Sequence, residues 1–389
     1  MAGYVFVLTA NMNLFAFFAL APTFRDDLGI SKFDTSLLLT GAGAMMLILA
    51  VPLGFLADRL GRHRVAVAAG VLIVASSIGH AVAPDFWTLM AARIVFGIGF
   101  TGMLTAGIAW TASSVPLAQR ARAIGGVMPA AASAGLAGPL LGGQLTDLGG
   151  TELAYAVLGT LSALSLIWLA RSPAGDSAPH AQPSQRELGR ILRSPVMLTA
   201  LTLLLLGVLV DVMVSLLVPL RLDENGLSAG TIGIVLAAGG VLYVLSALVA
   251  VRNAERIVNL RAAGIVSFAI ALPLIPLALS SSTAMQSAGA ISRGLALGVC
   301  FTVAFPLGAL GATAMGAGLG AANGALMVSS GLANAVGPIG SERVADAVGD
   351  TWTFGGLAIA CAVAGALMLI AARTDSSRAS RTTTRPALR

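Results

Sequence analysis

Three ionisable residues lie deep inside long apolar runs of the chain: Arg93, Asp211 and Arg293. Charged side chains in lipid-spanning segments are costly and rare, and most of them serve a substrate or ion pathway. Asp211 could carry a proton, because access or substrate could switch its charge beside a cation. Arg93 could instead bind an anionic group. Alternatively, these residues have only a structural role, as a buried ion pair and an arginine whose side chain extends to the membrane–water interface.

A second group of charges lies between two apolar runs, in the sequence GFLADRLGRHR at 54–64. Its three arginines are Arg59, Arg62 and Arg64. They could simply fix the orientation of the chain, since Lys and Arg rather than net charge decide which side of a membrane a loop occupies. Asp58 and Gly61 need another explanation. A carboxylate at a helix end can interact with the positive N-terminus of a neighbouring helix, so we expect Asp58 to act in a gate.

The other reactive side chains are scattered. Cys300 and Cys361 fall inside apolar runs without metal-ligand spacing, and the three histidines lie far apart in the chain. The glycine-rich sequence GAGLGAANG follows no strand pattern and lacks a phosphate-binding lysine. We therefore expect no enzyme activity, no metal and no cofactor.

The elements that position these residues must be helices in lipid. The apolar residues make up 57% of the 389-residue chain and the mean hydropathy is +0.90, far outside the range of soluble domains. Runs of about 20 apolar residues can cross a bilayer as helices, and the alternation typical of strands is missing. The predicted spans are 4–24, 36–57, 65–83, 86–112, 123–145, 153–170, 196–221, 230–251, 262–281, 285–311, 319–342 and 352–372. The predicted fold is all-α, with twelve transmembrane helices.

A polar stretch rich in Pro, Ser and Arg separates the spans into two sets of six. We therefore divide the chain into an N-terminal six-helix bundle (1–170), a cytoplasmic linker (171–195), a C-terminal six-helix bundle (196–372) and a cytoplasmic basic tail (373–389). Most of the 23 lysines and arginines lie on the cytoplasmic side if both termini are inside. This distribution explains the net charge of +6 without a nucleic-acid partner.

The two sets of six repeat one another. The segments that correspond most clearly are LAPTFRDDLGIS at 20–31 and LVPLRLDENGLS at 217–228. Four pairs of motif residues also correspond: Asp58 with Glu255, Arg59 with Arg256, Gly138 with Gly337 and Pro139 with Pro338. Equivalent halves in parallel orientation are typical of transporters whose site lies between the halves near the bilayer midplane.

With these features the chain resembles the major facilitator superfamily over nearly its whole length. The charged loop is similar to the family signature between helices two and three, which is matched by Gly54, Asp58, Arg59, Gly61 and Arg62, with Arg64 following. Glu255 and Arg256 resemble a degenerate copy in the second half, where Val258 replaces Gly61. The sequence RIVFGIGFTG at 93–102 resembles the family's helix-four pattern, and GGVMPAAASAGLAGPLLGG at 125–143 its helix-five pattern for exporters.

The resemblance implies roles for two of these groups of residues. Asp58 would face the cytoplasmic start of helix eleven, near 320–323, when the inner side is closed, and this contact would act as a latch. Residues that allow close contact and bending of helices five and eleven at the interface of the halves are Gly125, Gly138, Pro139, Gly142, Gly143, Gly337 and Pro338.

The family architecture also places helix seven beside helix ten, which makes Asp211 and Arg293 partners. The first half offers Arg93 no membrane carboxylate, only the amides of Asn11 and Asn13. Many exporters of this family that take cationic drugs carry an acid in helix one, and this chain does not, which argues against cationic substrates.

We therefore expect a secondary transporter of the plasma (inner) membrane, a proton-coupled exporter of small apolar or weakly acidic molecules that works by alternating access. Its partners would be a small-molecule substrate, protons and the lipid bilayer, and it would act as a monomer. Two alternatives stay open: an organic-anion exchanger or uptake carrier that uses Arg93, and a membrane sensor that does not transport.

Overall fold

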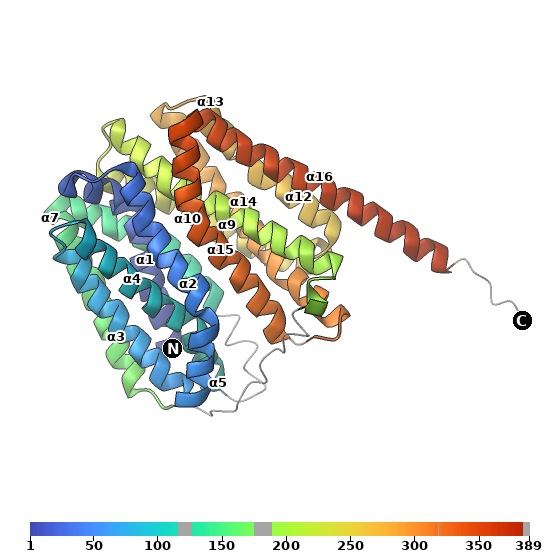
Figure 1. Cartoon of the computed structure of the whole chain (residues 1–389), viewed down its shortest axis with the longest axis horizontal. Helices are drawn as coiled ribbons and strands as arrows, with labels where there is room; N and C mark the ends of the chain where they lie inside the picture. Colours follow the sequence, from blue (N-terminus) through green and yellow to red (C-terminus); the bar gives the residue numbers. More distant parts are fainter. Residues whose placement is uncertain (116–126, 175–188, 318, 384–389) are drawn as a thin grey trace, which may run out of the picture.

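The computed structural model describes residues 1–115, 127–174, 189–317 and 319–383. Within these ranges every regular element is a helix. The helices form two bundles that lie side by side, drawn blue to green for the first half of the chain and yellow to red for the second (Figure 1). The predicted all-α architecture of two bundles is thus confirmed.

The first bundle follows the predicted spans closely. Its helices are α1 (Ala2–Leu28), α2 (Lys32–Leu60), α3 (Arg62–Ala81), α4 (Phe86–Gly102), the π-helix η1 (Met103–Gly107), α5 (Ile108–Ser113) and α7 (Val127–Arg171). The segments α4, η1 and α5 are continuous and together form one crossing. The long helix α7 is broken at Gly149 and Gly150, where Gly150 has a φ of 74° that favours glycine. Its two arms therefore correspond to the two spans predicted at 123–145 and 153–170.

The second bundle contains the remaining helices. These are α9 (Pro195–Glu224), α10 (Ala229–Arg252), α11 (Ala254–Ile257), α12 (Leu260–Ala271), α13 (Leu274–Leu279), α14 (Thr283–Ala314), α15 (Leu319–Val348) and α16 (Asp350–Thr383). The predicted span 262–281 is divided into α12 and α13 at Pro273, because proline interrupts helical hydrogen bonding. Helix α16 continues beyond the predicted end of the last span at 372 and extends out of the bundle (Figure 1).

Ten of the described helices are long and apolar enough to cross a membrane. One of them, Pro129–Arg171, contains both arms of α7 and accounts for two crossings. A further helix, α15, is rich in glycine and polar residues and packs against α2, α9, α14 and α16. Because protein rather than lipid surrounds much of α15, it needs less apolar surface than its neighbours. Twelve spanning helices result, six in each bundle.

Polar and glycine residues at the helix ends set these bounds. Gly29 ends α1 and Gly61 ends α2, with φ angles of 60° and 95° that L side chains rarely adopt. Asp85 begins α4, and its carboxylate accepts a hydrogen bond from the backbone N–H of Thr88 at 2.8 Å. This hydrogen bond holds the pKa of Asp85 below its usual range.

The two bundles meet along two helix pairs, α7 with α10 and α2 with α15. Glycine permits the close approach. A Cβ atom on Gly233 would collide with the carbonyl oxygen of Pro139, and one on Gly43 would collide with the carbonyl oxygen of Asn334. The backbones of the two halves therefore approach directly, as small residues allow in membrane proteins.

We predict that Gly233→Val destabilises the contact between the bundles, because its side chain has no room against Pro139. Overpacking of this kind typically costs about 1–3 kcal/mol. Thermal unfolding of the purified protein in detergent should show a midpoint several degrees lower. The matched control is Gly356→Val on α16, where a Cβ atom meets nothing within 4 Å. An equal midpoint for the two variants would contradict the prediction.

Candidate functional site

A cavity of about 130 Å³, here called the central cavity, lies between the two bundles. Helices α1 and α7 line it from the first bundle, and α9, α10 and α14 line it from the second. Its polar lining residues are Asn11, Asp211, Ser215, Tyr243 and Arg293. Its wall also contains the aromatic side chains Phe15, Phe18 and Phe301.

Asp211 and Arg293 form an ion pair at this cavity, as the sequence predicts. Nη1 of Arg293 lies 3.3 Å from Oδ1 of Asp211. The same nitrogen donates hydrogen bonds to the backbone carbonyl oxygen of Asp211 at 3.0 Å and to the hydroxyl of Ser215 at 2.5 Å. Asp211 and Ser215 are one turn apart on α9, so both face Arg293 on α14.

This ion pair compensates a buried charge. The Asp211 carboxylate lies beside Arg293, which is only 8% exposed. In surroundings of low dielectric constant, where charge–charge interactions are strong, Arg293 depends on this counter-charge.

Arg93 is even more deeply buried, at 1% exposed, but has a different environment. Its Nε donates a hydrogen bond to the carbonyl oxygen of Leu38 at 3.3 Å. Its guanidinium carbon lies 3.9 Å from the ring centroid of Phe17 and 5.1 Å from that of Phe96. Within the described ranges neither Nη1 nor Nη2 has a hydrogen-bond partner, and no carboxylate forms an ion pair with Arg93.

The expectation that the amides of Asn11 and Asn13 are the polar partners of Arg93 is wrong. The Nδ2 of Asn13 donates to Ser162 at 2.9 Å, and its carbonyl oxygen accepts from Ser77 at 2.8 Å. Asn11 donates to the carbonyl oxygen of Val7 at 2.8 Å and lines the central cavity. The physical reason is the helical period: two residues apart on α1, the amides point to different sides of the helix.

A second cavity, of about 120 Å³, lies beside Arg93 and is here called the Arg93 cavity. It is bounded by α1, α2 and α4 of the first bundle and by α9 and α15 of the second. Its lining is mainly apolar, with Leu39, Phe96 and Phe100 on one side and Val212 on the other, while Asn334 adds an amide.

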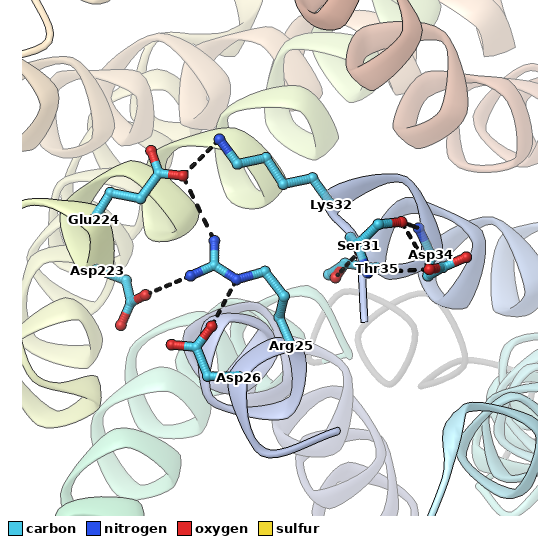
Figure 2. Close-up of polar contacts among 8 residues, drawn as sticks. All are labelled: Arg25, Asp26, Ser31, Lys32, Asp34, Thr35, Asp223 and Glu224. Atoms are coloured by element: carbon cyan, nitrogen blue, oxygen red, sulfur yellow. Dashed lines mark hydrogen bonds and ion pairs between the residues drawn. The ribbon is translucent and has the colours of Figure 1, made fainter. Parts of the chain in front are cut away.

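Four ion pairs join the charged ends of α1, α2 and α9, here called the Arg25 gate. Figure 2 shows the Arg25 guanidinium among three carboxylates: it lies 2.8 Å from Asp26, 2.9 Å from Asp223 and 3.7 Å from Glu224. Lys32 lies 2.6 Å from Glu224. All but the Arg25–Asp26 pair connect one bundle to the other, so the bundles are tied together at this end.

Other contacts close the same end. The Asp147 carboxylate on α7 accepts hydrogen bonds from the hydroxyl of Ser228 at 2.7 Å and from the backbone N–H of Gly230 at 3.0 Å, at the start of α10. The Arg343 guanidinium on α15 lies 4.1 Å from the ring centroid of Phe33 on α2.

Sequence reasoning did not identify the Arg25 gate. A signal was present, because the repeat aligns the charged ends of the first and seventh spans, which carry Arg25 and Asp26 in one half and Asp223 and Glu224 in the other. Only the arrangement of the bundles shows that these ends face each other.

The predicted gating loop lies at the opposite end of α2. Asp58 lies 3.6 Å from Arg62, one turn further along the chain, while Arg59 and Arg64 are exposed. The buried residues of α2 lie mainly at 35–43, near the Arg25 gate. Part of the segment 320–323 lies outside the residues whose side chains are described, so the latch stays a prediction.

The loop and its copy differ in backbone geometry. Gly61 makes its turn with a positive φ of 95°, whereas Val258 follows the short helix α11 with a φ of −84°. Glu255 and Arg256 are exposed on α11, and Gly54 has no atom within 4 Å of a built Cβ.

The predicted hinge residues have different neighbours. Gly138 and Gly142 face α1, where an added Cβ atom would meet Met12 and Ala16. Only Gly143 and the carbonyl of Pro139 lie at α10 of the other bundle. On α15, Gly337 faces Leu209 and Val212 of α9 in its own bundle, and Pro338 lines the Arg93 cavity. Gly125 lies outside the described residues. Among the described members of this set, Gly143, Pro139 and Pro338 thus lie between the bundles, and the hinge role of the set stays a prediction.

Comparison with known proteins gives consistent matches. The family model described as Major Facilitator Superfamily matches residues 2–325. A multi-drug resistance efflux pump PmrA homolog of Lactococcus lactis is 31% identical over 150 residues, which are 38% of this chain and 37% of that protein. Quinolone resistance protein NorA of Staphylococcus aureus is 25% identical over 232 residues, 58% of each chain. These matches span less than two thirds of the length of the relatives.

Two solved structures share the fold. A bacterial homolog of the human lysosomal transporter Spinster, in an inward-facing and unoccupied conformation, superposes with a TM-score of 0.71 at 16% identity and covers 98% of this chain and 96% of that one. A POT family transporter in complex with 5-aminolevulinic acid superposes with a TM-score of 0.78 at 13% identity and covers 96% of both chains.

We predict that Arg25→Gln opens the gate end of the bundles. The substitution removes two ion pairs between the bundles, each worth roughly 0.2–1 kcal/mol at a partly exposed site, so the conformational equilibrium should shift severalfold. Spin labels on Trp87→Cys and Ala284→Cys, exposed positions of opposite bundles, would show this opening as a larger share of long distances between the two labels.

The matched control is Asp26→Asn, because the Arg25–Asp26 pair lies within one bundle. The native Cys300 and Cys361 are buried, so a thiol-reactive spin label should attach only to the two introduced cysteines. An unchanged distance distribution in Arg25→Gln, or the same change in both variants, would show that the ion pairs between the bundles do not hold this end.

Proposed function

Because the chain belongs to the Major Facilitator Superfamily, a family of carriers and not of enzymes, we propose that this multi-pass membrane transporter exports small apolar or weakly acidic molecules in exchange for protons. The observation that carries the proposal is the Asp211–Arg293 pair at a cavity lined by both bundles. Intramembrane carboxylates of this kind form proton relays in transporters. Substrate and proton would compete for the same cavity and so exchange across the membrane.

The direction and the substrate class rest on separate observations. The relatives are named as a multi-drug resistance efflux pump and a quinolone resistance protein, which supports export. Quinolones carry a carboxylate, which agrees with a weakly acidic substrate. Asp211 is the acidic residue that lines the central cavity, and it is paired with Arg293, so a cationic drug would have to break an existing ion pair.

Alternating access would be a rocking of the two bundles about the cavities. The Arg25 gate joins the bundles at one end. We propose that this end faces outward, that Asp58 closes the opposite, cytoplasmic end against helix α15, and that Arg59, Arg62 and Gly61 support that latch. The halves would correspond to 1–170 and 196–372, with the glycines and prolines of α7 and α15 allowing their helices to bend.

The remaining proposals concern location and assembly. The distribution of arginine and lysine supports cytoplasmic termini in a plasma (inner) membrane. We propose that the monomer transports, since the two bundles of one chain together line each cavity. Exchange of organic anions is the second candidate function, and the observation that favours it is that no carboxylate among the described residues forms an ion pair with Arg93.

We predict that Asp211→Asn abolishes proton-driven export but leaves downhill exchange of substrate, because the amide cannot take up and release the proton. Accumulation of nalidixic acid, a quinolone with a carboxylate and no basic amine, driven by an imposed pH gradient in proteoliposomes, should fall to background. The control is Asp85→Asn, which removes an exposed carboxylate outside the spans and retains a helix-capping side chain. Uphill transport at the wild-type rate by Asp211→Asn would refute the proposed coupling.

We further predict that Asp58→Asn lowers transport severalfold and shifts accessibility toward the cytoplasmic side. A carboxylate at a partly buried helix N-terminus contributes up to about 2 kcal/mol, enough to change a conformational ratio more than tenfold. Glu255→Gln, the copy of this position in the second half, should have the smaller effect because Val258 stands in place of Gly61. Unchanged transport and unchanged accessibility in Asp58→Asn would exclude the latch.

A further inference from the structure

The Arg93 guanidinium has no counter-charge within the part of the chain that the structure describes. It is 1% exposed, and its Nη1 and Nη2 have no hydrogen-bond partner among the described residues. The carbonyl oxygen of Leu38 engages only Nε. The rings of Phe17 and Phe96 contribute a cation–π contact but accept no hydrogen bond of the strength a carboxylate provides.

Arg293, the other arginine in the middle of a span, is balanced by Asp211. Of these two arginines within the spans, Arg93 is therefore the one without an ion pair among the described residues. A buried charge without partner is strongly unfavourable, which favours binding of an anion beside it.

Space for an anion is present. Arg93 lines the Arg93 cavity of about 120 Å³ together with Leu39, Phe96 and Phe100. The amide of Asn334 is the other polar group of its wall. A ligand that fits must combine one negative group with an apolar body, because the rest of the lining is mainly hydrocarbon and aromatic.

We propose that Arg93 binds the carboxylate of a lipophilic organic acid whose apolar body occupies the Arg93 cavity. This inference rests on the proposed function and specifies its substrate class. Nη1 and Nη2 of Arg93 are two parallel donors, which matches the two oxygens of a carboxylate. The bound monoanion would neutralise the charge of Arg93, which has no ion pair among the described residues.

The acid site is separate from the Asp211–Arg293 pair. Phe18 lines both the central cavity and the Arg93 cavity and therefore stands between them. The carboxylate binds Arg93 from the first bundle, while α9 and α15 of the second bundle complete the cavity. Rocking of the bundles would thus open this cavity, and the proton at Asp211 would remain on the other side of Phe18.

Equilibrium binding to the purified protein tests this inference without a gradient. The probes are 4-butylbenzoate, ionised at pH 7.5, and 4-butylbenzamide, its uncharged analogue of similar shape. The wild type should bind the acid at least about tenfold more tightly than the amide, as expected for hydrogen bonds to a charged group. Arg93→Gln should lose this preference and keep its affinity for the amide, and Arg93→Lys should retain part of it.

The control Arg252→Gln, which removes an exposed arginine at the end of α10, should leave the preference unchanged. Equal binding of acid and amide by the wild type would overturn the inference, as would a preference that survives Arg93→Gln or that is lost instead in Arg293→Gln. Acid preference without transport would contradict the proposed function alone, whereas transport of neutral compounds without acid preference would contradict this inference alone.

Discussion

An uncompensated charge inside a bilayer is costly, and this constraint governs the middle of the molecule. The charge of Arg293 is compensated by Asp211 and Ser215, which lie one turn apart on α9 and both contact one nitrogen of the guanidinium. The charge of Arg93 is compensated only in part, by one backbone carbonyl and two aromatic rings. The two halves of a repeated fold therefore differ: Arg293 has a carboxylate partner within the protein, and Arg93 has none among the described residues.

The contacts between the bundles follow a different physical principle. Along α7 and α10, and along α2 and α15, glycine lets backbone approach backbone, so the surfaces fit closely without large side chains. At one end, ion pairs of Arg25 and Lys32 hold the bundles together in a place that water can reach. Ion pairs in water contribute little individually and can be broken and remade, which suits a contact that must open in every transport cycle.

Much of the fold could be predicted from the sequence. Apolar runs of the right length gave the twelve spans, and the break between 145 and 153 is the kink at Gly149 and Gly150. The break at Pro273 was not predicted, although proline is its cause, because the run of apolar residues continues through it. Helix α15 was also predicted as a span, although it is more polar than the other spans, and its protein neighbours account for that composition.

The candidate site was predictable where a single residue type carried the signal. Asp211 and Arg293 stand out because charge is rare in spans, and family architecture correctly paired them. Asn13 was assigned to Arg93 because it adjoins Leu14, the counterpart of Asp211 in the repeat, but the rotation of α1 turns it to Ser77 and Ser162. The Arg25 gate depends on how the two bundles are placed relative to each other. The residue pattern along a single helix carries no information on that placement.

The central claim is that substrate leaves in exchange for protons at the Asp211–Arg293 pair. Its most direct test uses proteoliposomes that contain nalidixic acid, a quinolone without a basic amine, and a pH-sensitive dye, and that are diluted into substrate-free buffer. As nalidixic acid leaves, the interior should become more acidic than in vesicles without protein, and vesicles with Asp211→Asn should match those without protein. Protein-dependent loss of nalidixic acid at the internal pH of protein-free vesicles, or with a further alkaline shift, would contradict proton exchange.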